Sequence, residues 1–238
     1  MEERRTGRVV IVTGAGRGIG RATALAFGAA GDHVVLAARS EAALDATAAE
    51  VRAAGGAATV VSCDVTTEPQ VKHLIESAAS VHGHIDIVVC NAGTAVVAPF
   101  TDIPLSDWEQ TLRVTLTGTF LVCKHAVARM QAGGHVFTLA SIAGRSGFPH
   151  WSAYSAAKFG VLGFTEAMRA ELRPRGIRVT AVIPGAVDTA LWDTVPGEWN
   201  RGNMLQPADV ARAIIRAAAE PPHVGVDEIV LSHIAGTL

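Results

Sequence analysis

The sequence has few of the residues that define metal-binding or disulfide-bonded proteins. Its 238 residues include three cysteines, Cys63, Cys90 and Cys123, and no CxxC pair. This odd, scattered set provides neither a disulfide framework nor the ligand spacing of a zinc site. The nine histidines also lack metal-ligand spacing, and we interpret them as surface or capping residues. We therefore expect no metal site.

The sequence also lacks a large excess of either charge and has no long apolar run. Lysine and arginine total 20 and aspartate and glutamate 22, so the net charge is −2, which argues against a nucleic-acid or membrane partner. No uncharged apolar run reaches the roughly 18 residues that a membrane-spanning helix needs. Residues 1–8 carry both signs of charge and do not match a signal peptide. We therefore expect a cytoplasmic protein.

The pattern that is present is an alternation of strands and helices. Strands are predicted at residues 8–13, 33–38, 58–62, 85–90, 135–140, 177–183 and 226–231. Helices are predicted at residues 18–30, 41–54 (with Ser40 as N-cap), 68–81, 106–131, 151–173 and from Gln206-Pro207 onward. The strands are nearly continuous apolar runs, as expected when both faces are covered. This predicts an α/β fold: one domain over residues 1–238, with a seven-stranded, doubly wound parallel sheet and helices on both faces.

A glycine-rich segment follows the first predicted strand. It reads TGAGRGIG at residues 13–20, and Gly14, Gly18 and Gly20 fit a G-x-x-x-G-x-G spacing. Small residues between a strand and a helix let the backbone approach a pyrophosphate, which the helix N-terminus attracts. The alternative is a glycine-rich turn without a ligand.

The second predicted strand ends without the carboxylate that holds the ribose 2′-hydroxyl of NAD. It continues into Arg39 and Ser40, while Glu41 fits the first turn of the next helix. Arginines such as Arg17 and Arg39 suit a 2′-phosphate, and the alternative is two solvated surface residues. We predict NADP(H) as the preferred cofactor over NAD(H).

A possible proton-transfer site lies further along the chain. Tyr154, the only tyrosine, and Lys158 are four residues apart on one face of a predicted helix. Ser141 follows the fifth predicted strand, at the sheet edge where open α/β folds bind ligands. A tyrosine–lysine pair alone is usually surface decoration, so its meaning depends on the other motifs.

Taken in order, these motifs resemble the pattern of one enzyme family. The glycine loop, Cys90-Asn91-Ala92-Gly93, Ser141, Tyr154-x3-Lys158 and Pro184-Gly185 together resemble the short-chain dehydrogenase/reductase family, from Val9 to about Leu231. The resemblance implies a Rossmann fold that transfers a hydride between NADP(H) and a small carbonyl or alcohol substrate. In it, Tyr154 is the general acid or base, and Lys158 lowers its pKa and holds the nicotinamide ribose. Ser141 orients the substrate.

The resemblance also assigns the cofactor contacts. They are Gly14, Arg17, Gly18, Ile19 and Gly20 in the loop; Arg39 and Ser40; Asp64 and Val65 at adenine; Asn91, Ala92 and Gly93 beside the adenine ribose; Tyr154 and Lys158; and Pro184, Gly185, Val187 and Thr189 at nicotinamide. The alternatives are an Asx-turn at Asp64 and an ordinary turn at Pro184-Gly185.

Two positions depart from the family pattern. Cys90 replaces an asparagine, and because it ends an apolar strand we predict a buried structural thiol. Thr115 replaces an asparagine to which the resemblance assigns a helix kink and a water linking Lys158 to solvent. A threonine hydroxyl can bond a water or its own helix backbone. Thr115 is therefore either part of a proton relay or a helix residue without a catalytic role.

The substrate is indicated only in outline. Residues 189–206 lack a clear period and resemble the family's substrate lid. Phe148, Trp151, Trp192 and Trp199 fall near the predicted substrate side, and aromatic walls suit an apolar carbonyl or alcohol. Alternatively, Trp192 and Trp199 pin the loop or pack on another subunit, or Asp193, Glu198 and Arg201 bind a polar substrate.

Two other functions remain open at this stage. One is a catalytically poor dinucleotide-binding redox sensor or interaction protein, and the other is an NAD-linked alcohol dehydrogenase of the same fold. The long helices starting near Ser106 and Trp151 resemble those that pair subunits in the family, so we expect a homodimer or homotetramer.

Overall fold

Seven parallel strands form a single sheet in the computed structural model, which describes residues 7–236. Its spatial order is β3-β2-β1-β4-β5-β6-β7. The strands are β1 (Val9–Thr13), β2 (His33–Ala38), β3 (Ala57–Ser62), β4 (Ile85–Cys90), β5 (Met130–Leu139), β6 (Arg178–Pro184) and β7 (Glu228–Leu231). The strand order changes direction between β1 and β4, which makes this the switch point where such sheets bind ligands.

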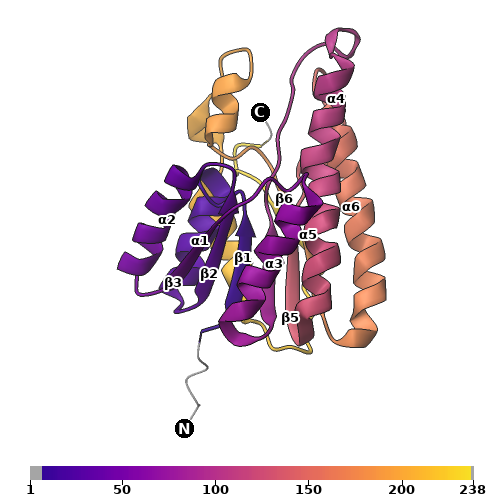
Figure 1. Cartoon of the computed structure of the whole chain (residues 1–238). Helices are drawn as coiled ribbons and strands as arrows, with labels where there is room; N and C mark the ends of the chain where they lie inside the picture. Colours follow the sequence, from indigo (N-terminus) through magenta and orange to yellow (C-terminus); the bar gives the residue numbers. More distant parts are fainter. Residues whose placement is uncertain (1–6, 237–238) are drawn as a thin grey trace.

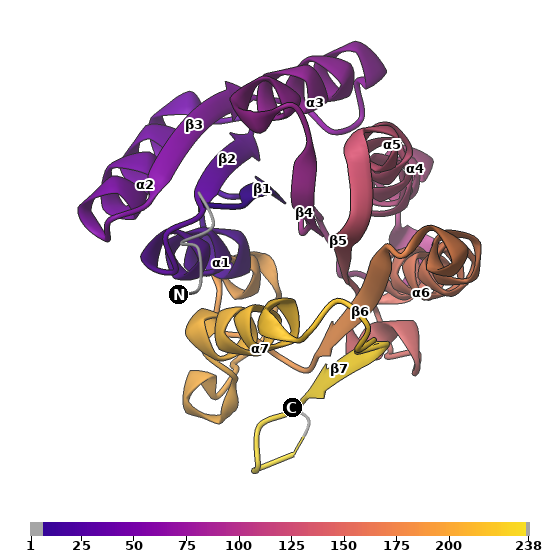
Figure 2. The same ribbon diagram turned by 90° about the horizontal axis from the view of Figure 1, so that it is seen from below.

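Helices cover both faces of the sheet (Figure 2). One face carries α1 (Gly18–Ala29), α2 (Glu41–Ala53) and α7 (Pro207–Ala219); the other carries α3 (Glu68–His82), α4 (Leu105–Leu112), α5 (Gly118–Ala126) and α6 (Ser152–Leu172). Each face has its own apolar core against the central strands. The predicted single-domain, doubly wound Rossmann fold is confirmed.

The helix predicted at residues 106–131 is wrong as a continuous element. Between α4 and α5 the chain forms a π-turn, Arg113–Thr117, in which the Gly118 N–H donates to the Arg113 carbonyl. Residues 130–131 belong to β5 instead of a helix, because buried Met130 pairs with Ile85 across an irregular register. The strand thus starts before Gly133 and Gly134, whereas the sequence predicted a start at residue 135.

The burial of His135 and Cys90 bears on two predictions, that the histidines lie at the surface and that Cys90 is a buried thiol. His135 is 1% exposed and stacks on Phe137, so the surface interpretation is wrong for it. Burial lowers the pKa of His135 to about 3, and its Nε2 pairs with the Thr180 hydroxyl at 2.7 Å. Cys90 is buried as predicted, with its Sγ 3.5 Å from that of Cys123.

Within residues 7–236, no group of three or more potential ligands is arranged to hold a metal ion. Every helix in this part of the chain is too short or too polar to span a lipid bilayer. The charged segment at residues 1–6 lies outside the described residues.

Candidate active site

A cleft of about 1190 Å³ opens at the carboxyl ends of the strands. Its walls come from the loops at the top of the sheet in Figure 1, including the segment at residues 189–206 (orange), and from α4 and α6. All of the sequence-predicted site residues line it except Gly20 and Thr115. The motifs that are scattered along the chain therefore meet in one place.

The glycine loop lies between β1 and α1, and its glycines have different roles. Gly14 and Gly18 line the cleft with φ values of +65° and +54°, a region that favours glycine. Gly20 is buried beneath the loop, where a Cβ atom would lie 2.2 Å from the Gly14 carbonyl oxygen. Gly20 therefore shapes the loop without forming part of the cleft wall.

The N-terminus of α1 points its free backbone groups at the cleft. Arg17 is the N-cap, and its side chain makes no capping hydrogen bond. The first N–H groups of a helix need partners, and an anion such as a pyrophosphate satisfies them. The loop and the helix end thus fit a dinucleotide.

Asn91 joins the glycine loop to the turn after β4. Its Nδ2 donates to the carbonyl oxygens of Thr13 at 2.9 Å and Gly14 at 3.3 Å. The backbone N–H groups of Asn91 and Ala92 both donate to the Thr13 hydroxyl. Asn91, Ala92 and Gly93 line the cleft while holding the two loops together.

The charged end of the cleft surrounds the predicted adenosine position. Arg17, Arg39 and Ser40 line it beside Asp64. Ser40 caps α2 as predicted, accepting from the Ala43 N–H. Burial tends to raise the pKa of Asp64, but hydrogen bonds from Thr66 and the charge of Arg39 lower it on balance. Those Thr66 bonds form the Asx-turn, so Asp64 has both of the roles weighed from the sequence: it shapes the turn and lines the cleft.

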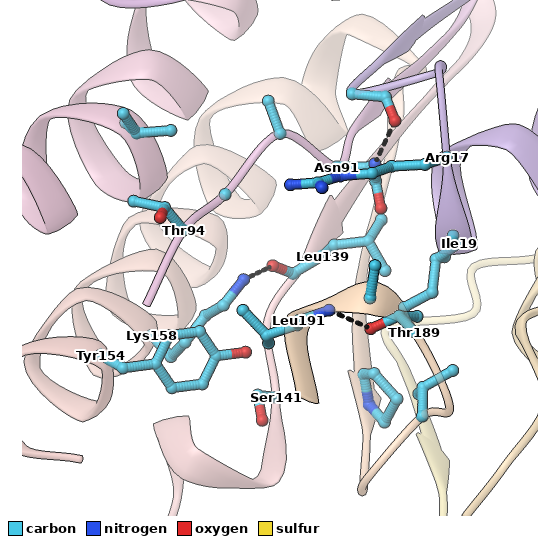
Figure 3. Close-up of a pocket in the computed structure, with 18 of the residues that line it drawn as sticks. Arg17, Ile19, Asn91, Thr94, Leu139, Ser141, Tyr154, Lys158, Thr189 and Leu191 are labelled. Atoms are coloured by element: carbon cyan, nitrogen blue, oxygen red, sulfur yellow. Dashed lines mark hydrogen bonds between the residues drawn. The ribbon is translucent and has the colours of Figure 1, made fainter. Parts of the chain in front are cut away.

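Ser141, Tyr154 and Lys158 lie together at the other end (Figure 3). Tyr154 and Lys158 are one turn apart on α6. Ser141 caps the short turn Ile142–Gly144, which packs so tightly on α6 that a Cβ at Gly144 would lie 2.8 Å from the Lys158 carbonyl oxygen. This contact positions the serine beside the tyrosine–lysine pair.

Burial controls the ionisation of these groups. It lowers the pKa of Lys158 to about 8, and Lys158 Nζ donates to the Leu139 carbonyl oxygen at 2.5 Å. Burial also raises the pKa of Tyr154, with the Ser141 hydroxyl acting in the opposite direction. The expectation that Lys158 lowers the tyrosine pKa is therefore not met. Lys158 Nζ lies 5.5 Å from the centre of the tyrosine ring, and its bond is to the backbone.

Thr115 lies inside the π-turn, 1% exposed, and outside the cleft wall. Its hydroxyl donates to the Thr94 carbonyl oxygen and accepts from the Thr94 N–H, each at 3.3 Å. The Thr115 carbonyl oxygen accepts from the Thr119 hydroxyl at 2.8 Å. Both polar groups of the residue therefore have protein partners.

Replacing Thr115 by valine should loosen the Thr94 turn. Valine keeps the shape but leaves the Thr94 N–H and carbonyl without the hydroxyl, which costs about 1–3 kcal/mol of stability. We expect a lower free energy of unfolding and a KM for the cofactor raised several-fold, while Thr115→Ser stays close to the parent. Urea unfolding and steady-state kinetics measure both. A fall in kcat with unchanged stability would instead indicate a proton-relay role.

The segment after β6 leads from the cleft floor into residues 189–206. Pro184, Gly185, Val187 and Thr189 line the cleft, as predicted for the nicotinamide end. The Thr189 side chain reaches the glycine loop, since a Cβ at Gly18 would lie 3.2 Å from its Cγ2. The segment contains two short 3-10 turns, Ala190–Thr194 and Arg201–Asn203.

The cleft also has wall residues that the sequence analysis did not identify. They include Thr94, Gln110, Val114, Leu139 and Leu191. The four-residue spacing of Gln110 and Val114 was the available signal, because it places both on one face of a helix. The Leu139 carbonyl is a backbone group, and no side-chain pattern marks it.

Comparison with known proteins identifies the class of protein. A family model described as short chain dehydrogenase matches residues 8–198. The chain therefore belongs to this family of oxidoreductases, and the resemblance noted in the sequence is confirmed.

Individual relatives are similar along their whole length. The chain is 35% identical to a sepiapterin reductase of Chlorobaculum tepidum, covering 97% of this chain and 98% of the relative. An alcohol dehydrogenase from the archaeon Thermococcus sibiricus, complexed with 5-hydroxy-NADP, has a TM-score of 0.90 at 25% identity and covers 97% and 98% of the two chains. An actinorhodin polyketide ketoreductase with NADPH has a TM-score of 0.87 at 30% identity, over 95% and 96%.

Proposed function

We propose that this protein is an NADP(H)-dependent oxidoreductase that interconverts a carbonyl compound and its alcohol. The observation that carries the proposal is the meeting of Ser141, Tyr154 and Lys158 in the same cleft as the glycine loop. The bound cofactor donates or accepts the hydride. The chain's own residues supply position and the proton.

In the direction of reduction, Tyr154 donates its phenolic proton to the carbonyl oxygen. Its raised pKa keeps the phenol protonated at neutral pH, which suits a general acid. Ser141 orients the same oxygen through its hydroxyl. Lys158, fixed by the Leu139 carbonyl, holds the nicotinamide ribose.

The preference for NADP(H) rests on the charged end of the cleft. Arg17 and Arg39 line it, and β2 ends at Ala38 with no carboxylate where NAD would need one. Two guanidinium groups there favour a 2′-phosphate. The relatives bound to NADPH and 5-hydroxy-NADP agree with this preference.

A pH profile follows from the Tyr154 pKa. Reduction needs the phenol, so Tyr154 should hold kcat/KM level through neutral pH, with a fall only above the ordinary pKa range of tyrosine. Oxidation of the alcohol needs the phenolate, so its rate should rise up to about tenfold per pH unit below that pKa. Initial rates in both directions between pH 6 and 11 check the profile. An oxidation rate independent of pH would contradict it.

The test of the proposal is a direct titration followed by turnover. NADPH and NADH are titrated separately against the purified protein, and then a panel of uncharged ketones is added. We expect tighter binding of NADPH and a ketone-dependent loss of its absorbance at 340 nm. Tight NADPH binding without turnover on any ketone would favour a sensor, and tighter NADH binding would favour an NAD-linked dehydrogenase.

We also propose that the chain forms a homo-oligomer through α5 and α6. Phe120 on α5 and Phe159 on α6 are 42% and 47% exposed, and Phe120 packs edge-on against Phe164 of α6. Large exposed aromatic side chains on neighbouring helices are typical of subunit contacts. Light scattering that reports a monomer would overturn this.

A further inference from the structure

Three indole rings continue from Tyr154 along the cleft wall. The ring of Trp151 lies 5.4 Å from that of Tyr154, Trp192 lies 5.8 Å from Trp151, and Trp199 lies 4.9 Å from Trp192, between ring centres. Neighbouring planes are inclined by 57° to 65°. The rings therefore pack on one another in series, and all three line the cleft. We call these three residues the indole wall.

The central ring of the indole wall is fixed in its orientation. The Trp192 indole N–H donates to the Val187 carbonyl oxygen at 3.0 Å. Because an indole has a single donor, this bond leaves Trp192 only its apolar ring surface for a ligand. Val187 belongs to the segment proposed for the nicotinamide, so the bond also ties the wall to the reacting end of the cleft.

Among the described residues that line this end of the cleft, Lys158 is the one with a charged side chain. The other charged residues that line the cleft are Arg17, Arg39 and Asp64, all at the adenosine end. Lys158 Nζ lies 5.5 Å from the centre of the Tyr154 ring and donates to the Leu139 carbonyl oxygen.

The polar alternative weighed from the sequence is disfavoured by the same geometry. Arg201 binds Asp188 at 2.8 Å and Asp193 at 2.5 Å, so its guanidinium is held by two carboxylates of the protein itself. Asp193, Glu198 and Arg201 do not line the cleft. The indole wall and the scarcity of charged side chains are two separate observations, and both indicate an apolar ligand surface.

We infer that the substrate is a flat, uncharged aromatic carbonyl compound. Its carbonyl lies at Ser141 and Tyr154, and its ring system extends along the indole wall; this rests on the proposed function. A planar ring gains stacked and edge-to-face contacts there, beyond the burial of apolar area. A carboxylate would lose its hydration without finding a charged partner.

Binding to the NADP⁺-loaded protein tests the inference without turnover. Calorimetry compares 2-acetonaphthone, its fully saturated decalin analogue and 6-acetyl-2-naphthoate. The saturated analogue buries a similar apolar area, so a preference for the naphthone reports the ring contacts themselves. We expect the naphthone to bind about tenfold more tightly than the saturated analogue, and the naphthoate to bind more weakly than the naphthone.

Variants of the indole wall test whether the preference for the naphthone over its saturated analogue depends on these rings. Trp192→Leu should reduce the preference for the naphthone to about twofold, whereas Trp192→Phe, which keeps a ring but no N–H, should retain most of it. Trp108 on α4 does not line the cleft, so Trp108→Leu is the matched control and should leave the preference unchanged.

Equal binding of the naphthone and its saturated analogue would overturn the inference, as would tighter binding of the naphthoate or a preference that survives Trp192→Leu. Turnover is measured separately with NADPH. Reduction of aliphatic ketones without any ring preference would leave the proposed function intact and remove only this inference. A ring preference with no turnover of any ketone would remove the proposed function and keep the ligand class.

Discussion

Tyr154→Phe should reduce kcat by about 10²- to 10⁴-fold in both directions, the usual contribution of a positioned acid or base. The substitution removes one oxygen and keeps the ring that packs against Trp151. Binding of NADPH should therefore stay within about twofold of the parent, because the glycine loop and the arginines are unchanged. Stopped-flow or steady-state assays measure the first quantity and fluorescence titration the second.

Phe100, an aromatic residue that is 76% exposed, provides the control. Its side chain does not line the cleft, so Phe100→Leu should leave kcat unchanged. Turnover by Tyr154→Phe at more than a tenth of the parent rate would contradict the proposed role of the tyrosine as general acid or base. Loss of NADPH binding in the same variant would mean that the hydroxyl acts on the cofactor instead.

Arg39→Asp should reverse the preference between the two cofactors. The new carboxylate at the end of β2 repels a 2′-phosphate and can accept a hydrogen bond from a ribose 2′-hydroxyl. We expect NADPH affinity to fall by about 10- to 100-fold, as for loss of a charge-assisted hydrogen bond, while NADH affinity holds or rises. Separate titrations with NADPH and NADH give both constants.

The charge change itself needs a control. Arg216 lies on α7, exposed and away from the cleft, so Arg216→Asp changes net charge equally without touching the cofactor site. Its NADPH affinity should match the parent's. An unchanged NADPH affinity in Arg39→Asp would refute a phosphate contact at Arg39. An equal loss in both variants would show that only the long-range charge matters.

Most of the fold could be predicted from local patterns in the sequence. β2 and β4 begin and end at the predicted residues, because each is an apolar run between turns. Ser40 caps α2, and the spacing of Tyr154 and Lys158 placed both on one face of α6. These features depend on neighbours within a few residues, and a sequence displays them directly.

The features that escaped prediction depend on distant partners. His135 is buried because Thr180, on the neighbouring strand β6, accepts its hydrogen bond. Lys158 bonds a backbone carbonyl, and the Thr115 hydroxyl bonds the Thr94 backbone. None of these pairings leaves a periodic signal, so only the folded chain displays them.

The π-turn at Arg113–Thr117 lets two adjoining helices face different surroundings, the cleft for α4 and the core for α5. A regular α-helix turns by about 100° per residue, so one extra residue shifts the phase of everything beyond it by that angle. Gln110 on α4 and Val114 in the π-turn line the cleft, while Leu121 and Val122 on α5 are buried in the core. Substitutions on the ligand side of α4 can therefore accumulate without a matching change in α5. The substrate range can diverge while the core that supports it stays the same.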